Sequence, residues 1–485
     1  MPIMPPRMLI PLIVACGLFM ENLDSTVLST SLPAIAADLQ VEPISLKLAL
    51  TSYLLSLAVF VPISGWVADK YGARTVFMAA IAVFTGGSML CGLAHSLPEF
   101  VAYRVIQGLG GAMMVPVGRL VILRSVSKSE LISALAWLTI PALIGPVIGP
   151  PLGGFITTYF HWRWIFYVNV PMGVLGLVLT WKYIANVKEM QTPPLDKVGF
   201  ALSGIGLSAF VFGLAVLGEN AGSLTAGFVL AALGLAVCAA YVWHSRRIAN
   251  PVIDLNLLRI PTFRASVIGA TFFRIGVGAI PFLLPLMLQI SFGLTPFQSG
   301  MITFTAAAGA LLMKATAAPI IRTFGFRNVL IVNSMVSAGF LAVNGFFSIG
   351  TPHMVIVALL LVGGFFRSLE FTAINALAYA DIRQEDMSRA TSFASVAQQV
   401  SLSLGVAIGA LILQAARGLR GETQIVQADF AIAFWIVAAI GAISVISFVR
   451  LPKGAGAELA SLPAHTAVTP QASAANPRAE ATAPQ

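Results

Sequence analysis

The sequence predicts an all-helical membrane protein that crosses the bilayer many times. Of its 485 residues, 58% are hydrophobic and only 10% are charged. A soluble domain of this length carries about a quarter charged residues. The apolar residues also gather in runs of about 20, the length that a helix needs to cross the hydrocarbon core. The predicted fold class is therefore all-α and polytopic.

Fourteen such runs follow one another and predict 14 transmembrane helices. The first begins like a signal peptide, with Arg7 before an apolar core. It continues well past Cys16, so we expect it to remain as a helix. The predicted spans are 8–37, 46–68, 74–95, 98–122, 131–158, 164–184, 198–218, 224–244, 264–289, 296–320, 328–349, 353–380, 389–415 and 430–450.

The distribution of lysine and arginine predicts a cytoplasmic N-terminus. With this orientation, 18 of the 28 basic residues lie at cytoplasmic helix ends and loops, and four lie on the opposite side. An even number of spans then places the C-terminus in the cytoplasm as well. The net charge of +9 follows from this topology and does not indicate a nucleic-acid partner.

The chain contains a faint internal repeat. The stretch GWVADKYGARTVF follows the second predicted span, and APIIRTFGFRNVL follows the tenth. Gly72 and Arg74 align with Gly325 and Arg327, whereas the acid Asp69 has no counterpart in the second copy. Repeats of this kind are typical of transporters built from two related bundles with the substrate path between them.

The repeat predicts how the chain divides. Six spans form each bundle, and the two spans between them form an inserted pair. The predicted parts are an N-terminal six-helix bundle (1–190), an inserted helix pair (191–245), a cytoplasmic linker (246–263), a C-terminal six-helix bundle (264–450) and a disordered cytoplasmic tail (451–485).

The first copy of the repeat predicts a conformational latch. Gly65 would let two helix ends approach closely, and Gly72 would permit a tight turn. Asp69, followed by Lys70, can accept hydrogen bonds at a helix N-terminus, or pair with Arg74 or another cytoplasmic cation. The alternative is a charged turn that only obeys the positive-inside distribution.

Intramembrane charges provide the candidate coupling and substrate-binding residues. Arg104 lies within the fourth predicted span, and Gln107 follows one turn later. A charge at membrane depth usually faces a cavity or a carboxylate and is a functional candidate by default. Arg104 could tune the proton affinity of a nearby acid, or it could tether helices through backbone carbonyls.

Two carboxylates, Glu21 and Asp24, stand in the first span, three residues apart and so on one helix face. An acid buried away from water retains its proton more readily, and a second acid beside it strengthens this effect. Such a group can exchange a proton for an organic cation. The alternative role for Asp24 is a helix cap or tether.

A third acid, Glu370, lies one turn after Arg367 in the twelfth predicted span. This pair could neutralise itself. Alternatively, Glu370 could face the substrate path from the second bundle.

Small residues and prolines in GPVIGPPLGG predict a closely packed, bent hinge in the fifth span. Glycines spaced by four give one smooth helix face, and prolines remove backbone hydrogen bonds. Ordinary close packing is the alternative. The hinge and packing residues are Gly145, Pro146, Gly149, Pro150, Gly153 and Gly154.

These stretches resemble the signature motifs of the major facilitator superfamily. The fourteen spans, together with NLDSTVLSTSLPAIAADL and HWRWIFYVNVPMG, resemble its 14-spanner drug:proton antiporter family, the EmrB/QacA type. GGAMMVPVGRL and RIGVGAIPFLLPLMLQ are similar to its MdtD-like branch. The resemblance implies the major facilitator fold and a coupling role for Asp24. At Glu21 the family commonly has a neutral residue.

The resemblance implies a proton-coupled antiporter of a bacterial inner membrane that exports small hydrophobic or cationic compounds by alternating access. Its partners would be the substrate, protons and the lipid bilayer, with a periplasmic adaptor as a further candidate and no cofactor. The alternatives are a dedicated metabolite exporter on the same fold and a non-transporting membrane sensor or scaffold.

An enzyme is not expected. The three cysteines lie in apolar runs and the five histidines lie near helix ends or in the tail, with no catalytic or metal-ligand spacing. The sequence also has no nucleotide-binding loop of the G-x4-G-K-[ST] type.

Overall fold

The computed structural model describes residues 6–125, 131–186, 188, 192, 194–217, 221–422, 424–456 and 458. Most of the predicted tail, residues 459–485, lies outside this part of the chain. Every regular element in the described residues is a helix. Helices satisfy all their backbone hydrogen bonds internally, which the interior of a bilayer requires.

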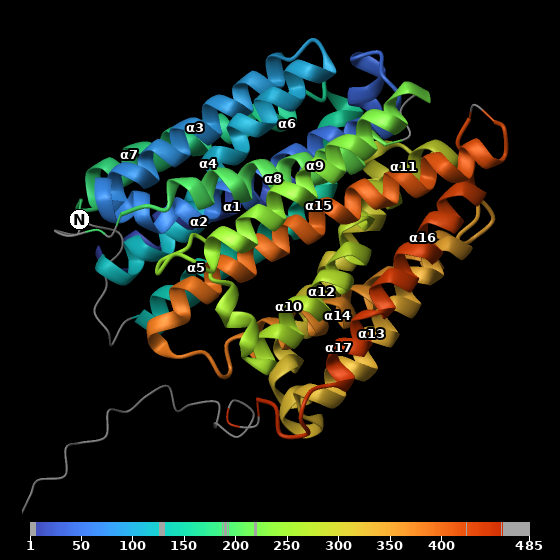
Figure 1. Cartoon of the computed structure of the whole chain (residues 1–485). Helices are drawn as coiled ribbons and strands as arrows, with labels where there is room; N and C mark the ends of the chain where they lie inside the picture. Colours follow the sequence, from blue (N-terminus) through green and yellow to red (C-terminus); the bar gives the residue numbers. More distant parts are fainter. Residues whose placement is uncertain are drawn as a thin grey trace, which may run out of the picture.

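The first half of the chain supplies the helices drawn from blue to green in Figure 1, up to α7. Short 3-10 or α turns precede α2 and α7 and join them into continuous spans. The elements are α1 (Pro6–Asp38), η1 (Pro43–Leu46), α2 (Lys47–Tyr71), α3 (Ala73–Leu93), α4 (Leu97–Ser125), α5 (Leu131–Tyr159), α6 (Trp164–Tyr167) and α7 (Asn169–Tyr183).

Two long helices follow, α8 (Lys197–Val216) and α9 (Ala221–Ser245), which pack on each other. The second half then supplies η2 (Leu255–Arg259), α10 (Pro261–Gly278), α11 (Ile280–Leu286), η3 (Met287–Ser291), α12 (Pro296–Phe324), α13 (Phe326–Val343), η4 (Asn344–Phe346), α14 (His353–Ala378), η5 (Gln384–Asp386), α15 (Met387–Leu419), α16 (Gln427–Ala442) and α17 (Ser444–Val449).

Thirteen spans within the described residues are long and apolar enough to cross a membrane. The 29-residue helix α5 occupies the place of the fifth predicted span and completes the predicted series of fourteen. The all-α polytopic fold class is therefore confirmed. The division of the chain at residues 190, 245 and 263 stays a prediction.

The helices form two groups. In Figure 1, α1–α7 run together across the upper left, and most of α10–α17 lie at the lower right, with α15 between them. The halves contact each other through α5 with α12, α2 with α15 and α1 with α11. The helix pair α8–α9 packs on α2 and α15, so it covers one of these contacts from outside.

The two repeat turns have the same backbone geometry. Gly72 ends α2 and begins α3 with φ 95°, and Gly325 ends α12 and begins α13 with φ 74°. Positive φ strains any residue with a Cβ, which accounts for glycine at both positions. We call the end of the molecule that carries these turns the basic end and the other the opposite end.

The arginines two residues later also make equivalent bonds. Arg74 donates to the carbonyl of Ile184, just after α7, at 3.4 Å. Arg327 donates to the carbonyl of Val449, the last residue of α17, at 3.0 Å. Each arginine therefore binds a carbonyl at the C-terminal end of its own half, where a cation is stabilised by the unpaired carbonyls. The sequence repeat corresponds to a structural one.

Hydrogen bonds join the two halves at the opposite end. Their distances lie between 2.9 and 3.3 Å. The bonds run from Lys47 to Gln414, from Gln289 to the carbonyl of Thr30, from the amide of Phe297 to Thr158, from Ser403 to the carbonyl of Thr51, and from Arg417 to Glu42. This end of the contact between the halves is closed.

The smooth face of α5 packs on α1. A Cβ built on Gly149 would collide with the side chain of Thr26, and one on Gly153 would collide with the carbonyl of Val27. Gly154 turns the other way and lies against Pro296 of α12. The small residues let α5 lie close to a helix of each half at once.

The α1–α5 contact can be tested with a single methyl group. We expect Gly149→Ala to destabilise the protein by about 1–3 kcal/mol, because the added carbon overpacks the contact with Thr26. Gly86→Ala on α3 is the matched control, since nothing lies within 4 Å of its added Cβ. Thermal unfolding in detergent measures both. Equal melting temperatures for the two variants would contradict the close contact.

Candidate functional site

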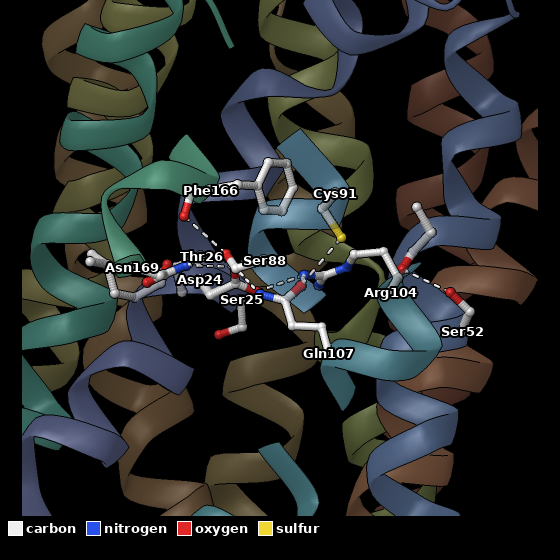
Figure 2. A network of polar contacts seen from close by, with 12 residues as sticks. Asp24, Ser25, Thr26, Ser52, Ser88, Cys91, Arg104, Gln107, Phe166 and Asn169 are labelled. Carbon is white, nitrogen blue, oxygen red and sulfur yellow. Dashed lines mark hydrogen bonds and ion pairs between the residues drawn. The ribbon is translucent and has the colours of Figure 1, made fainter. Parts of the chain in front are cut away.

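The carboxylate of Asp24 lies at the centre of a buried polar network (Figure 2). Its Oδ2 accepts a hydrogen bond from Arg104 at 2.6 Å, and its Oδ1 accepts from Gln107 at 2.8 Å and from Asn169 at 3.1 Å. Arg104 also donates to Gln107 at 2.6 Å. Asp24 is 3% exposed and Arg104 is fully buried. The carboxylate is bound on both oxygens, and its charge is balanced by one guanidinium.

A second layer of contacts fixes the donors. Asn169 donates to Ser88, which donates to the carbonyl of Phe166, both at 3.0 Å. Cys91 lies 3.7 Å from the amide oxygen of Gln107. The ring of Tyr53 stacks on the Arg104 guanidinium at 4.1 Å from its centroid, a favourable cation–π geometry.

The network draws on α1, α2, α3, α4 and α7. The sequence predicted that Arg104 would face a carboxylate or a cavity, and it identified Gln107, but it did not identify Asn169, Ser88 or Tyr53 as members. A polar residue inside an apolar run was the available signal for Asn169.

Because a buried charge left without its partner costs about 3–5 kcal/mol, this network also holds the first half together.

A deep cavity of about 430 Å³ lies between the halves. Arg104 reaches its wall from the first half, and Arg367 does so from the second. Most of the wall is apolar, with hydroxyl groups concentrated on α1. The polar lining residues are Asn22, Ser25, Thr26, Ser29, Tyr53, Arg104, Thr303 and Arg367.

A second cavity of about 570 Å³ continues from the first toward the basic end. The two share the residues Asn22, Ser25, Tyr53, Leu54 and Leu402, so they form one path. We call them the deeper and the outer cavity. Three charged side chains line the outer cavity within the described residues, namely Glu21, Arg119 and Arg274.

The two carboxylates of α1 occupy different environments. Asp24 points into the network and lines neither cavity, whereas Glu21 lines the outer cavity. The Oε2 atom of Glu21 is buried without a hydrogen-bond partner in the described structure. Of the two acids, Glu21 is therefore the one on the wall of the path.

Arg367 and Glu370 do not pair. Glu370 is fully buried and accepts hydrogen bonds from Ser334 at 2.6 Å and from Asn333 at 2.8 Å. It lines neither cavity, while Arg367 lines the deeper one. In this conformation, Arg367 and Glu370 therefore do not neutralise each other. Glu370 also does not face the cavity. The two residues are three positions apart on α14, and the Glu370 side chain is turned toward Asn333 and Ser334 of α13.

The predicted latch residues bind within the first half. Asp69 of α2 pairs with Arg124 of α4 at 2.7 Å, so its cation is Arg124 rather than Arg74. Lys70 lies 4.7 Å above the ring of Trp66. The close approach predicted at Gly65 is absent from this conformation, because no atom lies within 4 Å of a Cβ built there.

Pro146 and Pro150 of the predicted hinge line the deeper cavity. Gly145 lies against Asn22 and Leu23 of α1. The helix α5 continues as one element, Leu131–Tyr159, through these prolines. The two prolines thus face the cavity, whereas the glycines at 145, 149 and 153 pack on α1.

The sequence matches the family model described as Major Facilitator Superfamily over residues 14–255 and 266–479. Curated relatives named "Putative multidrug resistance protein MdtD" cover nearly the whole chain. The relative from Klebsiella pneumoniae (strain 342) is 35% identical over 92% of this chain and 94% of its own. The one from Serratia proteamaculans (strain 568) is 34% identical over 91% and 92%.

Solved transporter structures share the fold. A D-xylose-proton symporter aligns with a TM-score of 0.66 at 15% identity, over 92% of this chain and 98% of that chain. The POT family transporter PepTSo aligns with a TM-score of 0.68 at 15% identity, over 94% and 99%. Together with the family match, these similarities show that the chain belongs to the Major Facilitator Superfamily of membrane transporters, in its MdtD-like multidrug-resistance branch.

Proposed function

We propose that the protein is a proton-coupled antiporter that exports small hydrophobic or cationic compounds by alternating access. One observation carries the proposal. A cavity path between the two halves has an unpaired acid, Glu21, on its wall, and the buried Asp24–Arg104 pair lies one helical turn further along α1. The multidrug-resistance relatives support export of small compounds.

Alternating access is supported by the asymmetry between the two ends. Residues of both halves that lie toward the basic end, such as Arg119 and Tyr379, line the outer cavity. At the opposite end, hydrogen bonds such as Lys47–Gln414 join the halves. In the proposed cycle these bonds break while the basic end closes, and the cavity path then opens to the other side.

Glu21 and Asp24 take different roles in the proposed coupling. Glu21, which lines the outer cavity, exchanges a proton for a cationic substrate. Asp24 acts as a switch, because its protonation would remove the charge that holds Arg104 and loosen the contacts between α1, α4 and α7. Proton entry from the opposite side would then drive export.

The proposed setting is a bacterial inner membrane with both termini in the cytoplasm, so that the basic end faces the cytoplasm. The partners are the substrate, protons and lipid, and a periplasmic adaptor is a further proposal. Transport uses the proton gradient and no cofactor. Competition between substrates would distinguish a dedicated metabolite exporter from a multidrug exporter. A sensor or scaffold would move no solute.

Neutralising the two acids separates their roles. In proteoliposomes with an imposed pH gradient, we expect the wild type to move ethidium. We expect Glu21→Gln to lose most of this movement while keeping the wild-type melting temperature, because its carboxylate has a partner-free oxygen. Asp24→Asn should lose transport and also about 3–5 kcal/mol of stability, because Arg104 keeps its charge without a partner.

Glu99→Gln is the matched control, since Glu99 is exposed at the start of α4. It should transport like the wild type. Unchanged transport by both Glu21→Gln and Asp24→Asn would refute the coupling scheme. A folded wild type that moves no dye would favour the dedicated exporter.

Closure at the opposite end gives a second test. Ser403 of α15 lies 3.3 Å from the carbonyl of Thr51 of α2. With the three native cysteines replaced by alanine, we expect the variant Thr51→Cys/Ser403→Cys to crosslink on oxidation. Transport should stop and return on reduction, because the halves cannot separate there.

The control pair uses the same two helices nearer the basic end. Leu57 and Ala394 both line the outer cavity, and we expect Leu57→Cys/Ala394→Cys not to crosslink in this conformation. Full transport by the crosslinked Thr51/Ser403 variant would exclude opening at this contact.

A further inference from the structure

We propose that the deeper cavity binds amphiphilic organic anions, with Arg367 as the residue that binds the negative charge. The inference rests on the proposed function, since it names a substrate class for the same path. It adds anions to the hydrophobic and cationic compounds proposed above, because the charges on the walls of both cavities are mostly positive.

Arg367 is the charged residue on the wall of the deeper cavity whose charge no described residue balances. The other guanidinium on its wall, that of Arg104, is bound to Asp24 at 2.6 Å. Arg367 has no hydrogen-bond or ion-pair partner in the described structure, and Glu370 binds Ser334 and Asn333 instead. No carboxylate is among the described residues that line this cavity. An unpaired cation at membrane depth indicates a binding role.

A second polar group without a partner lies beside it. A small pocket of about 30 Å³ adjoins the deeper cavity and is lined by both Arg367 and Ser337. Ser337 is 8% exposed, and its Oγ has no hydrogen-bond partner in the described structure. A guanidinium and a free hydroxyl are donors that suit a carboxylate or sulfonate.

The neighbouring wall suits a hydrophobic body. Arg367, Phe371 and Asn375 follow at intervals of four on α14, so they share one face of the helix. Phe371 lines the deeper cavity with Leu402. An anion held at Arg367 would therefore place its apolar part against Phe371.

The outer cavity also carries an excess of positive charge. Arg119 and Arg274 face one acid, Glu21, among its described lining residues. Arg274 is 3% exposed and donates to the amide oxygen of Asn375 at 2.9 Å, a partner that leaves its charge unbalanced. An excess of positive charge along the path raises the local concentration of anions.

A matched pair of probes tests the inference on the full-length protein in lipid nanodiscs. 8-Anilinonaphthalene-1-sulfonate carries one negative charge, and N-phenyl-1-naphthylamine is a neutral compound with the same two ring systems. Energy transfer from the seven tryptophans reports the protein-bound probe. We expect the wild type to bind the anion, and Arg367→Gln to weaken that binding about tenfold or more while neutral-probe binding stays unchanged.

Two further variants control for charge and fold. Arg367→Lys keeps the charge and should keep most of the anion binding. Lys314→Gln removes an exposed cation that lines neither cavity and should bind both probes like the wild type. Anion binding that survives Arg367→Gln would overturn the proposal. So would an equal loss of both probes, which would show that Arg367 only shapes the cavity.

These outcomes are separable from those of the antiport experiments, because probe binding requires no gradient. Gradient-driven ethidium transport together with unchanged anion binding in Arg367→Gln would overturn the anion site alone. Selective loss of anion binding in a protein that transports nothing would overturn the proposed antiport alone.

Discussion

The rest of the structure depends on one buried negative charge, the carboxylate of Asp24, which must be balanced where water is excluded. An isolated carboxylate in a medium of low dielectric constant is too costly to keep, so it must be paired and fully hydrogen-bonded. Arg104, Gln107 and Asn169 meet this need from two other helices. Since each donor is itself fixed by neighbours such as Ser88, the charge orients most of the first half.

Close packing supplies the second constraint. The face of α5 with Gly149 and Gly153 allows it to touch α1, while Gly154 touches α12 of the other half. A helix shared in this way cannot move relative to one neighbour without changing its contact with the other. The repeated turns at Gly72 and Gly325 fix corresponding helix ends in both halves.

The sequence predicted the spans well because the bilayer imposes a length and a composition on each helix. It also identified the charged residues Glu21, Asp24, Arg104 and Arg367, since charge at membrane depth is rare. Their partners could not be read from spacing. Glu21 and Asp24 are three residues apart, yet one lines a cavity and the other is enclosed by donors.

By itself, the sequence determined the all-helical membrane fold, the positions of the spans and the repeat, because these depend on local composition and on backbone sterics at glycine. The tertiary structure decided which charges meet. Arg104 binds an acid 80 residues away, Asp69 binds one of two nearby cations, and Arg367 binds no acid among the described residues. Pairing depends on how helices from distant parts of the chain are rotated against one another, which a single helix cannot encode.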